Sequence, residues 1–351
     1  MIEVEQLSKI YGTTQAIRDV TFNVEKGEIL GFLGPNGAGK TTTMQILAGF
    51  LPATSGTARI AGYDVHEQSM AVRQRIGYLP ETPPLYPDMT VEGFLHFVAR
   101  IKGVAAGDRS KRVDLAVARC GLSERRKTLI RKLSKGFRQR VGIAQAIVHD
   151  PPVIILDEPT VGLDPRQIIE VRNLIKSLAG EHTIVLSTHI LPEVNMTCSQ
   201  VAIIKRGQVV ATDKIENLMG RLTGGMGYEV EVEADVAGLE ASLGSLFENI
   251  PGVKSIELLS REHLPENRYK WRMTAEPGTE PGRIIASRVV KAGLGLCELH
   301  RVQASLEDVF LELTMEDAKT PETEAEADVR DIQTPEPDMQ DSEPPENTPP
   351  E

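Results

Sequence analysis

Long apolar runs are missing from this 351-residue sequence, and so are closely spaced cysteines. No stretch reaches the ~18 apolar residues of a membrane-spanning helix, and the opening MIEVEQLSKIYG has no signal-peptide core. We therefore expect that the chain does not itself cross a membrane. Cys120, Cys198 and Cys297 lie far apart and in no metal-ligand spacing, which predicts reduced thiols rather than disulfides or a zinc site.

An excess of basic charge is also lacking. The formal net charge is −11, but residues 318–351 contain 11 acidic and 2 basic residues, which leaves the rest of the chain nearly neutral. We therefore expect no nucleic acid partner. Residues 318–351 are also rich in proline and poor in bulky apolar side chains, which predicts a disordered tail. This tail either solubilises the protein or docks a partner.

The most informative stretch that is present is GEILGFLGPNGAGKTTTMQILAGF, Gly27–Phe50. Residues Glu28–Leu33 are apolar and β-favouring and end at a Gly-Pro-Asn-Gly turn, which predicts a short buried strand. The loop Gly34–Thr41 (GPNGAGKT) follows, and a helix is expected to start at its lysine. This order is typical of the phosphate-binding loop of an NTPase, whose backbone N–H groups and helix N-terminus bind phosphate oxygens. Lys40 would then reach the β and γ phosphates, and the Thr41 hydroxyl would hold Mg²⁺.

The first part of the chain is expected to form an α/β core. Alternating or fully apolar residues predict strands at 2–24 (turn near Gly12), 28–33, 54–64 (turn at Ser55-Gly56), 152–156, 183–187, 201–205 and 208–211. Several of these alternate with helices, among them one at 166–178, which predicts a parallel sheet. Ligands of such a sheet bind at the carboxyl ends of its strands.

A helical insertion in this core is predicted from Val91 to Val148, broken near Gly103–Gly107 and at Gly121. Thr90 is expected to cap its first helix, with Glu92 favourable in the first turn. Its basic residues form either a solvated face or a surface near anionic lipid headgroups. They are Arg125, Arg126, Lys127, Arg131 and Lys132.

A second, smaller domain is expected after the glycine-rich linker at 223–227. Strands at 228–234, 253–259, 269–274 and 296–302 alternate with helices at 236–250 and 283–292, and a last helix is expected at 306–313. The order βαββαβ plus one helix predicts a ferredoxin-like α+β domain, in which we find no catalytic constellation. The expected domains are thus 1–222, with its helical part at about 85–148, then 228–317 and the tail 318–351.

Five motifs follow one another in a fixed order. They are GPNGAGKT at Gly34–Thr41, LSKGFRQR at Leu133–Arg140, VIILDEPT at Val153–Thr160, GLD at Gly162–Asp164 and STH at Ser187–His189. Over about residues 2–220 this set closely resembles the ATP-binding subunit of an ABC transporter. The LS-x-G motif ahead of DEPT makes the resemblance highly specific. It implies a P-loop NTPase core that binds ATP with Mg²⁺.

The resemblance also implies roles for individual residues. Nucleotide contacts are expected from Tyr11, Gly34, Asn36, Gly37, Ala38, Gly39, Lys40, Thr41 and Thr42. Tyr11 would stack on the adenine, although by its position alone it is a half-buried strand residue. Mg²⁺ is expected at Thr41, Glu81 and Asp157. Catalysis is expected from Lys40, from Glu158 as general base and from His189 at the γ-phosphate.

Asp157 and Glu158 have a second interpretation, as a pair of acids that cap the following helix. Two adjacent acids after four buried apolar residues are costly to place without a site, which favours the catalytic interpretation.

The resemblance places half of each ATP site on a second subunit. Ser134 and Gly136 open a helix that would face the γ-phosphate bound by the opposite subunit, and Asp164 would link the two sites. Because the chain has one phosphate loop and one such motif, a complete site requires two chains, head to tail. A second ATP-binding subunit is therefore expected, either another copy of this chain or a different one, and a homodimer is favoured.

Two positions depart from the usual family pattern. Lys135 stands inside the usual LSGGQ motif, where its cation either neutralises phosphate charge or faces solvent, and Glu81 stands where the family usually has Gln. Both variants, and the C-terminal Leu306–Phe310 (LEDVF), look like those of exporters whose ATPase and membrane subunits are separate chains, including drug, polysaccharide and gliding-machinery exporters.

The expected function is therefore an ATPase that drives a separate transmembrane permease from the cytoplasmic face of the membrane. The permease is expected to dock near Glu81 and the crossing Pro83–Asp88. One alternative is an ABC ATPase acting on ribosomes or DNA, but the chain has neither two cassettes nor long coiled coils. The other is a regulator without turnover, which would favour loss of Glu158 or His189, and both are present.

Overall fold

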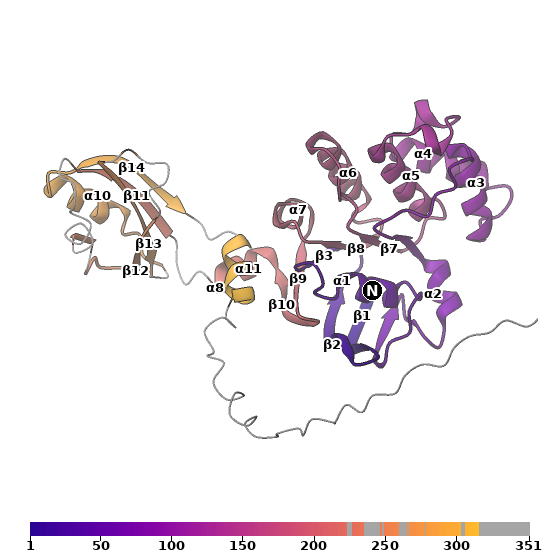
Figure 1. Ribbon diagram of the computed structural model, residues 1–351, viewed down its shortest axis with the longest axis horizontal. Helices are drawn as coiled ribbons and strands as arrows, with labels where there is room; N and C mark the ends of the chain where they lie inside the picture. Colours follow the sequence, from indigo (N-terminus) through magenta and orange to yellow (C-terminus); the bar gives the residue numbers. More distant parts are fainter. Residues whose placement is uncertain are drawn as a thin grey trace, which may run out of the picture. The chain divides into compact units, whose positions relative to one another are not determined.

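The computed structural model describes residues 1–222, 227–234, 246–247, 249–259, 265, 267–276, 278–302 and 306–315 (Figure 1). Within these residues the chain forms three sheets with helices packed on them. Two sheets are built from the first 222 residues and the third from residues 227–302. The candidate site belongs to the first part of the chain.

The central sheet has the strand order β10-β9-β3-β8-β7-β6. Its strands are β3 (Ile29–Leu33), β6 (Ile76–Leu79), β7 (Val153–Asp157), β8 (Thr183–Thr188), β9 (Gln200–Lys205) and β10 (Gln208–Lys214). All neighbours run parallel except β10, which is antiparallel because a tight hairpin joins it to β9. The predicted parallel sheet and closing hairpin are confirmed, and β6 is a further strand that the apolar pattern did not single out.

Both faces of the central strands are covered, which explains their unbroken apolar runs. In β7, Ile154 and Leu156 pack with the helical insertion. Val153 and Ile155 point to the other face and pack with the N-terminal strands. Side chains of successive strand residues point to opposite faces, so a strand buried on both sides needs apolar residues at every position.

The N-terminal sheet is antiparallel, with the order β2-β1-β4-β5. It contains β1 (Ile2–Tyr11), β2 (Thr14–Val24), β4 (Ser55–Ile60) and β5 (Tyr63–Asp64). The turn predicted at Ser55-Gly56 is wrong, because these residues begin β4. The chain turns instead at Ala61 and Gly62, both of which have positive φ angles, of 52° and 83°.

Five helices accompany these two sheets outside the insertion. They are α1 (Lys40–Leu47), α2 (Ser69–Arg75), α6 (Pro165–Leu178), α7 (Leu191–Thr197) and α8 (Ile215–Leu222). The helices predicted from Lys40 and at 166–178 are confirmed as α1 and α6. Asp164 caps α6, since its Oδ1 accepts a hydrogen bond from the Gln167 N–H at 2.9 Å.

The helical insertion contains α3 (Val91–Ile101), α4 (Arg109–Arg119), the short η1 (Ser123–Arg125) and η2 (Ile130–Lys132), and α5 (Lys135–Ile147). Thr90 caps α3 as predicted, and its hydroxyl accepts from the Gly93 N–H at 3.1 Å. Among the basic residues of the insertion, Arg126 forms ion pairs of 2.7 Å with Glu92 and Asp114. These acids neutralise part of that surface.

The third sheet is antiparallel, with the order β12-β13-β11-β14. Its strands are β11 (Gly227–Glu233), β12 (Val253–Leu258), β13 (Arg268–Ala275) and β14 (Gly295–Val302), and α10 (Gly282–Lys291) connects the last two. Numbered by chain order this is 2-3-1-4, the arrangement expected for a ferredoxin-like domain. Most of the helix predicted at 236–250, most of the linker at 223–227 and the predicted tail 318–351 lie outside the described residues.

The last described helix, α11 (Leu306–Met315), packs on the first part of the chain beside α8 (Figure 1). Leu306 is fully buried in an apolar cluster with Leu33, Val194, Ile203 and Leu218, among others. None of the described helices has both the length and the apolar character needed to cross a membrane.

Candidate active site

The phosphate loop follows β3 and ends at α1. A Cβ at Gly34 would collide with the carbonyl oxygen of Ile204, so the loop can run beside β9 only with glycine there. Gly39 has a φ of 105°, and a Cβ there would lie 2.6 Å from the Ile17 side chain. Helix α1 begins at Lys40, directly after Gly39, so the N-terminal end of the helix lies at the loop.

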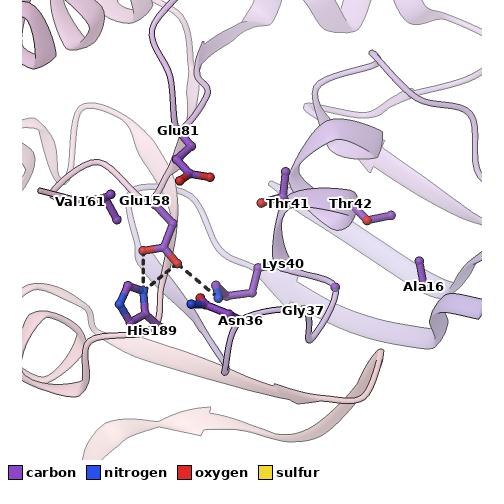
Figure 2. A pocket seen from close by; sticks show the side chains of 11 residues that line it. Ala16, Asn36, Gly37, Lys40, Thr41, Thr42, Glu81, Glu158, Val161 and His189 are labelled. Carbon is purple, nitrogen blue, oxygen red and sulfur yellow. Dashed lines mark hydrogen bonds and ion pairs between the residues drawn. The ribbon is translucent and has the colours of Figure 1, made fainter.

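A pocket of about 480 Å³ opens between this loop and the ends of β7 and β8 (Figure 2). Its lining contains the predicted residues Asn36, Gly37, Gly39, Lys40, Thr41, Thr42, Glu81, Glu158 and His189, together with Ala16 and Val161, which the sequence did not single out. Residues more than 150 positions apart in the sequence are therefore brought to one cavity, at the carboxyl edge of the parallel sheet.

Lys40 and His189 both contact Glu158 in this pocket. The Lys40 ammonium lies 3.2 Å from Glu158 Oε1, and both side chains are almost fully buried. Lys40 also donates to the carbonyl oxygens of Gly34 (2.8 Å) and Pro35 (3.2 Å). His189 Nδ1 lies 3.0 Å from Glu158 Oε2, and since a carboxylate only accepts, the Nδ1–H is assigned as donor. These contacts fix the orientation of the Glu158 carboxylate, and an oriented carboxylate is a group that can accept a proton from a bound water.

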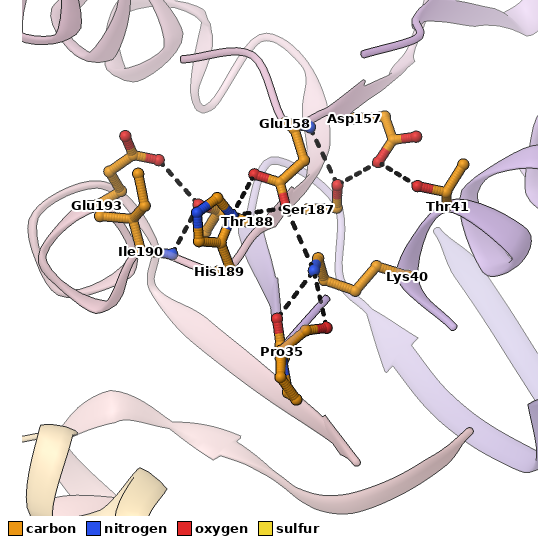
Figure 3. A network of polar contacts seen from close by, with 11 residues as sticks. Pro35, Lys40, Thr41, Asp157, Glu158, Ser187, Thr188, His189, Ile190 and Glu193 are labelled. Carbon is orange, nitrogen blue, oxygen red and sulfur yellow. Dashed lines mark hydrogen bonds and ion pairs between the residues drawn. The ribbon is translucent and has the colours of Figure 1, made fainter. Parts of the chain in front are cut away.

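Asp157 and Thr41 lie next to this triad. Ser187 Oγ donates to Asp157 Oδ1 at 2.5 Å, and Thr41 Oγ1 donates to the same oxygen at 3.4 Å (Figure 3). Burial raises the pKa of Asp157, and the hydrogen bonds from Ser187 and Thr41 oppose that rise. The other oxygen, Oδ2, is buried without a hydrogen-bond partner. Such an oxygen beside a threonine hydroxyl fits a Mg²⁺ ligand set of hard oxygens.

Glu158 adopts a strained backbone, with a φ of 46° that non-glycine residues rarely take. Its N–H is held by two acceptors, the Ser187 carbonyl oxygen and the Ser187 hydroxyl, both at 3.1 Å. The Ser187 hydroxyl thus bridges the two carboxylate residues, because it donates to Asp157 and accepts from Glu158. Sequence reasoning quoted Ser187 only as part of the STH motif and missed this role.

The second group of predicted residues lies outside the pocket. Ser134 caps α5 by accepting from the Phe137 N–H at 3.4 Å, and Asp164 caps α6. Gly136 packs against the side chain of Gln167, so the starts of α5 and α6 are neighbours. The Lys135 ammonium lies against Gly162, where a Cβ would collide with it, which places this cation beside the GLD motif.

Asp157, Gly34, Ala38 and Tyr11 are predicted site residues that do not line the pocket either. Gly34 contributes its carbonyl to Lys40, and Ala38 is buried in the apolar cluster below the loop. Tyr11 is 45% exposed at the end of β1, with the Lys9 ammonium 5.3 Å from its ring centroid. Its exposed ring is free to be covered by a ligand, and its adenine contact stays a prediction.

The chain is similar to known proteins in sequence and in structure. The family model described as "ABC transporter" matches residues 17–161. The Nod factor export ATP-binding protein I of Ralstonia nicotianae is 32% identical over 315 residues, which cover 90% of this chain and 94% of that protein. The chain belongs to the ABC transporter family. As an ABC protein it is an ATPase, the ATP-binding and ATP-hydrolysing subunit of an exporter.

Two further similarities concern the ATP-binding part of this ABC subunit. The bacitracin transport ATP-binding protein BcrA of Bacillus licheniformis is 39% identical over 223 residues, which cover 63% of this chain and 72% of that protein. A solved ATP-binding cassette, in a dimeric post-hydrolysis state bound to ADP and Pi, is 25% identical with a TM-score of 0.57. The match covers 61% of this chain and 99% of that structure. The predicted ABC ATPase fold and exporter family are thereby confirmed.

Proposed function

We propose that two copies of this ABC subunit bind two ATP molecules with Mg²⁺ between them and thereby drive a separate transmembrane permease. The observation that carries the proposal is that the predicted site residues form two groups. Lys40, Glu158 and His189 line the pocket, whereas Ser134 and Asp164 lie outside it at the starts of α5 and α6. A helix N-terminus such as that of α5 suits a phosphate group supplied by the opposite subunit.

Each pocket residue has a role in this proposal that follows from its contacts. The loop amides and Lys40 bind the β and γ phosphates, and Thr41, Asp157 and Glu81 hold Mg²⁺, which neutralises phosphate charge when bound. Glu158 accepts the proton of the attacking water, and His189 orients Glu158 and the γ-phosphate. Tyr11 stacks on the adenine, and Asp164 links the two sites.

The membrane partner is proposed from the family. A subunit of this kind works on the cytoplasmic face of a membrane, docked on a permease that is a separate chain. The names of the two relatives, a bacitracin transport protein and a Nod factor export protein, support transport of a compound across the membrane, with export as its direction. We place the docking surface at Glu81 and Pro83–Asp88, between the sheet core and the helical insertion, and we propose the predicted domain limits, 1–222 and 228–317, as they stand.

The requirement for two copies predicts a dilution effect. If the complete site needs a second subunit, the hydrolysis rate per molecule should fall as the purified protein is diluted through its dimerisation range. We expect the fall to coincide with the loss of dimer in sedimentation measured with ATP and Mg²⁺. A rate per molecule that stays constant while the protein remains monomeric would remove the two-chain site and the proposed mechanism.

A second prediction concerns Asp157→Asn, which we expect to make the nucleotide-free protein more stable and the enzyme inactive. Burial raises the pKa of Asp157, so its charged form is disfavoured in the folded state. This cost to folding is present at neutral pH and disappears as the pH falls through the raised pKa. Urea unfolding at pH 7 should therefore show a higher free energy of unfolding for Asp157→Asn.

The same substitution should lower Mg²⁺-dependent hydrolysis by about 100-fold, because a neutral amide binds the cation poorly. The difference in stability between the two proteins should shrink as the pH falls through the raised pKa and vanish below the ordinary pKa of an aspartate. A variant that is less stable at pH 7, or that keeps its hydrolysis rate, would contradict the role given to Asp157.

A further inference from the structure

Glu193 is a buried carboxylate that does not line the pocket. It lies in the first turn of α7 and is 5% exposed. One oxygen, Oε2, accepts from the Thr188 hydroxyl at 3.0 Å, whereas the other, Oε1, is buried with no hydrogen-bond partner. Burying a carboxylate with one oxygen unpaired disfavours folding, so an apolar side chain of similar size would favour folding more.

Thr188 connects this carboxylate to the segment that carries His189. Its hydroxyl donates to Glu193 and accepts from the Ile190 N–H at 3.0 Å (Figure 3). A hydroxyl has a single proton. Because the Thr188 proton points to the Glu193 carboxylate, a lone pair of the same oxygen is left to accept from the Ile190 N–H. Glu193 in turn donates its backbone N–H to the Ile190 carbonyl at 3.1 Å. The residues on both sides of His189 are therefore fixed by one small network.

This network is anchored to the strand that leads into the phosphate loop. Val194, next to Glu193, is fully buried in a cluster with Leu33, the last residue of β3. The contact is tight, since a Cβ at Gly31 would lie 2.9 Å from the Val194 side chain. Glu193 is thus held in a fixed position relative to Gly34 and the loop that follows it.

From this geometry we infer that Glu193 is a positioning residue for hydrolysis, acting through Thr188 on His189. The hydrogen bonds between Glu193, Thr188 and the Ile190 N–H fix the backbone conformation of residues 188–190. This conformation places His189 Nδ1 3.0 Å from Glu158 Oε2. The inference rests on the proposed roles of Glu158 and His189. It assigns no contact between Glu193 and the nucleotide, because the side chain does not reach the pocket.

The test uses the full chain with isosteric and conservative variants. Thr188→Val keeps the shape of the side chain and removes only the hydroxyl, whereas Thr188→Ser keeps the hydroxyl. Glu193→Met removes the acceptor, and Glu193→Gln retains one. We expect Thr188→Val and Glu193→Met to lower kcat by about 10- to 100-fold, because small displacements of a catalytic group cost that much. KM and the ATP dissociation constant should stay within about twofold, because neither residue binds the nucleotide.

The conservative variants separate positioning from a merely structural role. Thr188→Ser and Glu193→Gln should retain kcat within about threefold. Glu193→Met should melt at the same or a higher temperature than the parent, since it removes a buried carboxyl group that has one unpaired oxygen, and yet it should hydrolyse ATP slowly. A Glu193→Met protein with normal kcat, or a Thr188→Val protein whose only defect is a lower melting temperature, would overturn the inference.

Failure of the proposed function would look different. In that case Glu158→Gln would hydrolyse ATP normally, whatever the variants at Thr188 and Glu193 do. If Thr188→Val does not fold, Glu193→Met still tests the inference, because it removes the acceptor of the same Thr188–Glu193 hydrogen bond. Normal Glu158→Gln activity therefore rejects the site assignment, and normal Glu193→Met activity rejects only the positioning role.

Discussion

Glu158→Gln is expected to bind ATP normally and to lose hydrolysis by about 100- to 10,000-fold, the contribution typical of a general base. The substitution preserves the shape of a side chain that lies 3.0 Å from His189 Nδ1 and 3.2 Å from the Lys40 ammonium. It removes only the ability to take a proton and the negative charge beside Lys40. The pocket should therefore still accept nucleotide, while the attacking water is no longer activated.

A consequence of blocked hydrolysis is that the closed dimer should persist. Sedimentation or size-exclusion chromatography with ATP and Mg²⁺ should show Glu158→Gln as a stable dimer under conditions in which the parent protein dissociates. Glu181→Gln is a suitable control, because its side chain is 60% exposed and pairs with Arg119 on the surface. That control should behave as the parent, whereas normal turnover by Glu158→Gln would refute the assignment of the base.

The second large effect is expected when two inactive variants are mixed. Lys40→Ala destroys the phosphate-loop half of a site, and Ser134→Arg destroys the half proposed to come from the start of α5. In a head-to-tail dimer of one of each, one site combines two damaged halves and the other combines two intact halves. Mixing should therefore restore up to about a quarter of the parental activity, as random pairing of two kinds of subunit predicts.

The chain offers a matched control for this experiment. Lys40→Ala and Glu158→Gln damage the same half, so no pairing of these two variants contains an intact site. Their mixture should stay inactive at every ratio, measured as phosphate release. If Lys40→Ala and Ser134→Arg together also stay inactive while each folds and exchanges subunits, the proposed division of the site between two chains is wrong.

Local sequence signals predicted the parts of the site that depend on neighbouring residues. The strand before Gly34, the glycine loop and the start of α1 at Lys40 lie within 15 residues, and each has its own composition. The cap at Thr90 is likewise a short-range effect, since its side chain binds an N–H three residues further on. The cap at Asp164 has the same spacing but was not predicted. The resemblance to a family then added roles that no local pattern contains.

The contacts of the site that were not predicted depend on the register between strands that are distant in the sequence. Ser187 bridges the two carboxylate residues because β7 and β8 pair Asp157 with Ser187, and nothing local to either strand fixes that pairing. A shift of one residue would turn the hydroxyl to the other face of the sheet. The network of Thr188 and Glu193 was missed for a similar reason, because a glutamate in a first helical turn ordinarily serves only the helix dipole.

The position of α11 has a consequence for the way in which the chain matures. Leu306 and Phe310 complete an apolar cluster to which α8 also contributes, through Ile215 and Leu218. Roughly eighty residues separate these two helices in the chain. The helices at the two ends of this segment nevertheless pack in the same apolar cluster. During synthesis this cluster stays incomplete until α11 leaves the ribosome. A single backbone break in the segment between the two helices would leave two fragments that the cluster still holds together.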